Sequence, residues 1–178
     1  MQEPLPSDVA EAAAPVQHGP YGLVLRAVAR WLALAGGLVF VILVIMSIVS
    51  IVGRKLWSAP IPGDVELLQM CAAFASASFF AWCHLTGNDV KVDFFTHNWS
   101  PRKVAFLDGI GSLLVAVFGT LIAWRSFVGA LALYEYQETS PILAIPIWIA
   151  QMLMVPGFVV LALAGLYMAS RLLRGERA

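Results

Sequence analysis

Four long apolar stretches, separated by short polar segments, dominate the sequence. Residues 31–52 and 67–86 contain no Asp, Glu, Lys or Arg, and neither do residues 139–170. Between residues 109 and 134 the single charge is Arg125. About 20 apolar residues suffice for a helix to cross a hydrocarbon core roughly 30 Å thick. The pattern predicts an all-α integral membrane protein with four transmembrane helices.

The polar segments between these stretches define the expected organisation of the chain. We expect a disordered cytoplasmic tail over residues 1–19, followed by an amphipathic interfacial helix over 20–30. The transmembrane domain is expected over residues 31–174, and a short cytoplasmic tail over 175–178. The four spans within this domain are expected at about 31–53, 65–87, 105–134 and 144–172. An interfacial segment is expected between the second and third spans.

The segment before the first span has amphipathic character. Apolar residues recur at helical spacing from Tyr21 to Trp31, while Arg26 and Arg30 share another face. Two interpretations are equally open: a helix lying in the headgroup layer, or the first turns of the span itself.

Basic residues are unequally distributed between the ends of the spans. One side has only Arg54 and Lys55, whereas the other has eight: Arg26, Arg30, Lys91, Arg102, Lys103, Arg171, Arg174 and Arg177. Because Lys and Arg accumulate in cytoplasmic loops, both termini are predicted to be cytoplasmic. Segments 60–66 and 135–141 would then face a periplasm.

The second span begins with a turn at residues 60–63 followed by two acids. Asp64 is predicted to cap the helix, because its side chain can accept from unpaired backbone N–H groups. Glu66 would lie in the first turn, where the helix dipole favours an anion.

Small residues recur at four-residue spacing on two spans. They are Ala73, Ala77 and Ala81 on the second span, and Ser112, Ala116 and Thr120 on the third. This spacing predicts close helix packing, either internal or between subunits.

Several other side chains are expected at the membrane–water interfaces. Arg125 lies about 25 Å along its helix from Asp108, close to the outer headgroups, where it can snorkel or contact a partner subunit. Aromatic rings anchor at interfaces and basic groups meet lipid phosphates. The expected anchors are Trp31, Trp57, Phe94, Phe95, Trp99, Arg102, Lys103 and Trp148.

Composition and motifs argue against an enzyme. Hydrophobic residues make up 60% of the chain and charged residues 12%, about half the charge of a soluble domain, and the net charge of +0 makes nucleic acid an unsuitable partner. The sequence has no HExxH, GxSxG or phosphate-binding glycine loop. A haem would need a second intramembrane histidine beside His84, and Cys71 and Cys83 are about 18 Å apart along one helix, too far for a disulfide. We therefore expect no catalytic residue, cofactor or metal, and an accessory or scaffold subunit.

Four short motifs in a fixed order resemble those of one transporter family. They are Arg54, the segment 60–67 (PIPGDVEL), the segment 90–93 (VKVD) and the segment 140–148 (SPILAIPIW). Together, over residues 29–172, they resemble the small membrane subunit of tripartite ATP-independent periplasmic (TRAP) transporters, the DctQ-type family. Asp89 stands where that family often has histidine.

The resemblance implies a function and a set of partners. It implies a small permease subunit of a sodium-coupled importer of organic acids in a bacterial inner membrane, bracing a large multi-span subunit that is supplied by a periplasmic substrate-binding protein. Arg54, Asp64 and Glu66 match the outer motif and Asp93 the inner one. Partner contact and a local role, capping for Asp64 and Glu66 or solvation for Asp93, are both open. The alternative function is an anchor subunit of another membrane complex.

Overall fold

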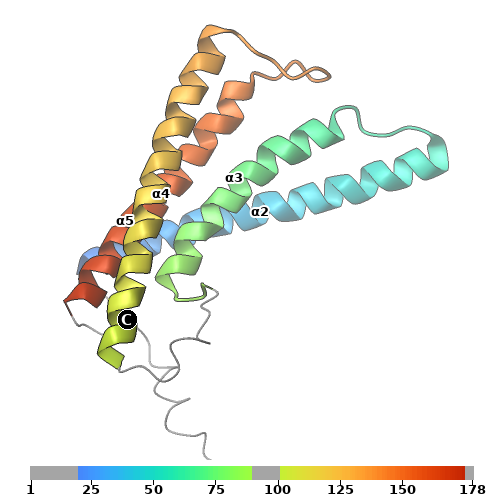
Figure 1. Cartoon of the computed structure of the whole chain (residues 1–178). Helices are drawn as coiled ribbons and strands as arrows, with labels where there is room; N and C mark the ends of the chain where they lie inside the picture. Colours follow the sequence, from blue (N-terminus) through green and yellow to red (C-terminus); the bar gives the residue numbers. More distant parts are fainter. Residues whose placement is uncertain (1–19, 90–100, 175–178) are drawn as a thin grey trace, which may run out of the picture.

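The computed structural model describes residues 20–89 and 101–174 and forms four helices (Figure 1). They are α2 (Pro20–Trp57), α3 (Asp64–Leu85), α4 (Pro101–Glu135) and α5 (Ile147–Leu173). All four are long and apolar enough to cross a membrane. The predicted all-α fold with four spans is confirmed.

Helix α2 is continuous over 38 residues, so a separate amphipathic helix over residues 20–30 is not present. Pro20 occupies the first helical position, where its missing N–H and fixed φ angle are tolerated, and no proline interrupts the helix after it. At about 57 Å, α2 exceeds the hydrocarbon thickness and must tilt or emerge from it. The predicted tails, 1–19 and 175–178, and most of the predicted interfacial segment lie outside the described residues.

The helices form two hairpins arranged as a V. Helices α4 and α5 lie side by side in one arm, α2 and α3 form the other, and the arms diverge from their meeting point (Figure 1). Within the described ranges α4 packs against α5 alone, whereas α5 also contacts α3 and α2. The arms meet where Ala29, Ala81, Leu85 and Ala164 form a buried core. We call this end the Arg26 end and the opposite one the Asp64 end.

Small side chains bring the backbones of α4 and α5 into contact. The buried face of α4 consists of Gly109, Ser112, Ala116, Gly119, Ala123, Ser126 and Ala130. A Cβ on Gly165 would lie 2.7 Å from the Ser112 carbonyl oxygen, and one on Gly119 would lie 3.1 Å from the Ala162 nitrogen. Lipid provides no hydrophobic force between helices, so such close approach supplies the attraction. The small-residue packing on α4 is therefore internal.

Three small residues of the third span were predicted to pack against another helix. The prediction is confirmed for Ser112 and Ala116 and wrong for Thr120. Thr120 is exposed, and its hydroxyl donates to the Ala116 carbonyl at 2.8 Å, while Gly119 takes the interface position. The stripe alternates steps of three and four residues, which keeps it on one face where a constant step of four drifts away. On α3, Ala77 and Ala81 are buried, and a Cβ on Gly157 of α5 would lie 2.7 Å from the Ala77 carbonyl oxygen.

Candidate functional site

Polar side chains gather at the Asp64 end, where the two arms are furthest apart. The turn at residues 58–63 places the last turn of α2 beside the first turn of α3. Gly63 adopts a left-handed conformation, with φ of 72°. A Cβ there would overlap the Leu143 side chain of the α4–α5 loop, so Gly63 serves both the turn and a close approach. We call Ser50, Arg54, Asp64 and Glu66, with the contacts that they make, the Asp64 cluster.

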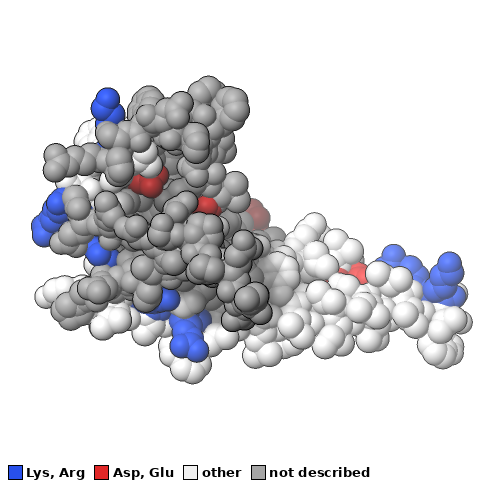
Figure 2. Space-filling model, turned by 90° about the horizontal axis from the view of Figure 1, so that it is seen from below, with Lys and Arg blue, Asp and Glu red and all other residues white. Residues whose placement is uncertain are grey.

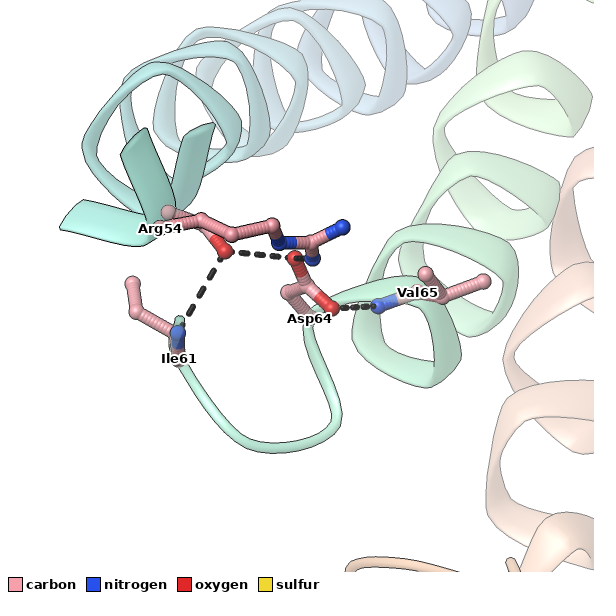
Figure 3. Close-up of polar contacts among 5 residues, drawn as sticks. Arg54, Ile61, Asp64 and Val65 are labelled. Carbon is pink, nitrogen blue, oxygen red and sulfur yellow. Dashed lines mark hydrogen bonds and ion pairs between the residues drawn. The ribbon is translucent and has the colours of Figure 1, made fainter. Parts of the chain in front are cut away.

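The Asp64 carboxylate ties α3 to α2 (Figure 3). Its Oδ2 accepts from the Ser50 hydroxyl at 2.5 Å and from the Arg54 guanidinium at 3.2 Å. Its Oδ1 accepts from the Val65 backbone N–H at 2.9 Å. Ser50 also accepts from the Ile61 N–H at 3.3 Å, so one hydroxyl joins the helix, the turn and the carboxylate.

Ser50 supplies the buried half of this link, although the sequence analysis singled out Arg54. The Ser50 residue is 0% exposed, whereas the Arg54 side chain is 60% exposed. An exposed ion pair contributes little because water and salt screen it. The available signal was a serine one helical turn before Arg54, near the end of a span without charged residues.

The prediction that Asp64 is the N-cap is wrong. The N-cap position belongs to Gly63, and Asp64 is the first helical residue. The Asp64 Oδ1 still accepts from a backbone N–H of the first turn, that of Val65, as predicted. The turn ends one residue earlier than predicted because Gly63 reaches the left-handed region without steric cost. Asp64 is then free to turn one carboxylate oxygen toward α2.

The Glu66 carboxylate ties α3 to the loop between α4 and α5. It lies in the first turn of α3, as predicted. One oxygen accepts from the Ile142 N–H at 2.9 Å and the other from the Leu143 N–H at 3.1 Å, across 76 and 77 residues of sequence. The Glu66 side chain therefore joins the two arms. The sequence analysis had considered only capping and partner contact for this residue.

The loop at residues 136–146 is folded so that these two N–H groups point outward from it. Thr139 and Pro146 form a backbone bridge, and the Ser140 N–H donates to the Ile145 carbonyl at 2.9 Å. Ser140 is buried, and its hydroxyl accepts from the Ile145 N–H at 3.3 Å. Ala144 takes a left-handed conformation, with φ of 52°. In this loop conformation the backbone N–H groups of Ile142 and Leu143 donate to the Glu66 carboxylate.

A cavity of about 400 Å³ lies beneath this loop, between α3, α4 and α5. Its polar lining is Glu66, Gln69, Ser126, Ser140 and Gln151. Both Glu66 oxygens already accept hydrogen bonds. Over residues 20–89 and 101–174 no three His, Cys, Asp or Glu residues group as metal ligands would. The cluster is built to hold helices together.

The other predicted residues are dispersed. Arg125 is exposed on α4, outside its contact with α5. Trp31 and Trp57 are 72% and 73% exposed, Lys103 is exposed, and Trp148 is half-buried edge-on to Tyr134 at 5.5 Å between ring centres. Their interfacial role stays a prediction. Asp93, Phe94, Phe95 and Trp99 and the side chain of Arg102 lie outside the described residues.

The sequence analysis did not identify the pair formed by His84 and Asp89. His84 is 7% exposed, and its Nδ1 lies 2.6 Å from an Asp89 carboxylate oxygen. The two residues are five positions apart in sequence, and the contact links the last turn of α3 to the segment that follows the Gly87 turn. The signal was an acid just after a helix that ends in histidine.

These features define a small multi-pass helical membrane protein with most of its described charges near the ends of its helices. Residues 43–175 match the family described as "Tripartite ATP-independent periplasmic transporters, DctQ component". The chain belongs to this family, and the resemblance found in the sequence is confirmed. The match includes the whole Asp64 cluster. No curated protein and no solved structure matches the chain.

Proposed function

We propose that this chain is the small permease subunit of a sodium-coupled importer of organic acids. Its membership of the DctQ family makes it a component of a tripartite transporter, which also has a large membrane subunit and a periplasmic binding protein. On this proposal it binds no solute and has no catalytic role. It acts as a rigid scaffold for the large subunit, which carries the solute and the sodium.

One observation carries the scaffold proposal: the polar side chains of the Asp64 cluster bond helices of this chain to one another. Ser50, Asp64 and Glu66 all make intramolecular bonds. Transporters place polar groups and broken helices at the bilayer midplane. Here the middle of the helix contacts is occupied by glycine and alanine instead.

The apolar faces of α2 and α4 support the same proposal. Leu38 on α2 is 63% exposed, and Phe118 and Trp124 on α4 are 60% and 67% exposed. Such faces suit lipid or another helical subunit. We propose that the large subunit covers part of them, with lipid on the remainder.

The distribution of Lys and Arg supports an orientation in a bacterial inner membrane. The proposal places both termini in the cytoplasm and the Asp64 cluster at the periplasmic face. There the outer turn of the first hairpin and the loop of the second lie within reach of a docked binding protein.

Affinity purification tests the partner assignment. The tagged chain, extracted from native membranes in mild detergent, is expected to retain a large multi-span permease identified by mass spectrometry. The control is the same purification from cells that lack the permease reading frame. Recovery of an unrelated membrane complex would instead favour an anchor role and contradict the proposal.

A further inference from the structure

A groove of about 470 Å³ lies at the Arg26 end, between the first turns of α2 and the last turn of α3. Its lining combines two arginines, two tryptophans and two leucines: Leu23, Arg26, Arg30, Trp31, Leu34 and Trp82. It lies far from the Asp64 cluster and shares no residue with it. We call it the arginine groove.

No acid among the described residues pairs with the two arginines of the arginine groove. Arg26 and Arg30 lie one helical turn apart, so both side chains occupy the same face of α2. Within residues 20–89 and 101–174 the ion pairs are Arg54–Asp64 and His84–Asp89, and neither involves these arginines. Like charges four residues apart repel, and an anion between them would relieve that repulsion.

Trp82 holds Arg26 at the wall of the groove. The Arg26 guanidinium carbon lies 5.6 Å from the centre of the Trp82 ring. A cation at this distance is attracted by the ring face, and the contact fixes a long side chain that would otherwise sample many rotamers. One cationic group is thus positioned before any ligand arrives.

The depth of the groove matches a lipid headgroup. Arg30 and Arg54 lie 24 positions apart on α2, or about 36 Å, so they fall in opposite headgroup layers of a core roughly 30 Å thick. Figure 2 shows Lys and Arg at both ends of the molecule, and on the face in view most of the arm between them carries no charged residue. Leu34 lies one turn deeper than Arg30 and is 53% exposed, so an apolar surface continues from the arginines toward the hydrocarbon.

We propose that the arginine groove binds an anionic phospholipid, with Arg26 and Arg30 on the headgroup phosphate and Trp31 and Leu34 along the start of an acyl chain. A soluble anion would pair with the arginines but leave these apolar side chains uncovered. Basic pockets between transmembrane helices are established sites for acidic lipids. The site requires no partner subunit, so it stands independently of the proposed transporter.

Native mass spectrometry of the full chain tests this site. The purified chain is mixed with micelles that contain equal amounts of phosphatidylglycerol and phosphatidylcholine, and the bound lipid is identified. We expect the anionic lipid to be preferred by about tenfold or more, and the preference to be lost in the double variant Arg26→Gln/Arg30→Gln. Lys55→Gln removes one exposed positive charge at the other end and is expected to retain the preference.

Two further measurements distinguish a bound lipid from a soluble anion and from a misfolded variant. The variant Arg26→Lys/Arg30→Lys keeps the charge and should keep most of the preference, while circular dichroism confirms that each variant is helical. An unchanged preference in the double glutamine variant would overturn the proposal. Displacement of the lipid by millimolar inorganic phosphate would assign the arginines to a soluble anion and also overturn it.

Discussion

Replacing Gly165 by alanine is expected to destabilise the chain by about 1–3 kcal/mol, because the added methyl group overpacks the contact between α4 and α5. The new Cβ would lie 2.7 Å from the Ser112 carbonyl oxygen and 2.8 Å from the Ala116 nitrogen. Both atoms belong to the backbone of α4, so no side chain can rotate away. The two helices must separate instead. Unfolding of the full chain in mixed detergent micelles, followed by circular dichroism, measures the loss.

Gly111 provides a matched control in the same hairpin. A Cβ there has no neighbour within 4 Å. Gly111→Ala should therefore leave stability unchanged or raise it by up to about 1 kcal/mol through helix propensity. Equal losses from the two alanine variants would show that the close contact at Gly165 does not hold the hairpin together.

The second large effect is expected at Glu66, where Glu66→Gln should release the α4–α5 loop from α3. The two carboxylate oxygens each accept from one backbone N–H, of Ile142 and of Leu143. A glutamine has only one oxygen, so its NH₂ group would face the second N–H donor. Amide hydrogen exchange at Ile142 and Leu143 should rise by about tenfold or more.

The matched control is Glu135→Gln, at the same end of the molecule. Glu135 is exposed and makes no side-chain hydrogen bond or ion pair with the described residues. Its neutralisation should leave loop exchange unchanged. If both variants gave the same exchange pattern, net charge rather than the Glu66 bonds would govern the loop.

The spans could be predicted from the sequence because membrane-crossing helices need only length and the absence of charge. Helix α5 begins at Ile147 and α4 at Pro101, both within a few residues of the predicted limits. The amphipathic pattern of residues 20–30 could not show whether the helix breaks before the first span. Amphipathicity describes a face, whereas a break needs a proline or a comparable interruption, and none is present.

The neighbours of each helix could not be predicted, because small residues occur on several faces of such helices. Thr120 and Gly119 are adjacent in sequence, and only the packing against Ala162 selects glycine. The same limit applies to the Asp64 cluster. Glu66 was correctly placed in a first turn, but its partners are backbone N–H groups, which every residue except proline carries and which leave no trace in sequence.

The V of two hairpins gives the proposed scaffold its form. The buried core that contains Ala29, Ala81 and Ala164 joins the arms near the Arg26 end, and the Glu66 carboxylate joins them at the other. A change at either place should alter the angle between two apolar faces that the large subunit would meet. Loss of transport in the Glu66 variant, with the subunit still present in the membrane, would follow from that change.

Uptake into proteoliposomes tests the central claim most directly. The large subunit, the binding protein and this chain are reconstituted together, each is omitted in turn, and a sodium gradient drives uptake of a radiolabelled carboxylate that the binding protein recognises. We predict uptake by the complete set and none when this chain is omitted or reconstituted alone. Accumulation by this chain alone, or undiminished uptake in its absence, would contradict the scaffold account.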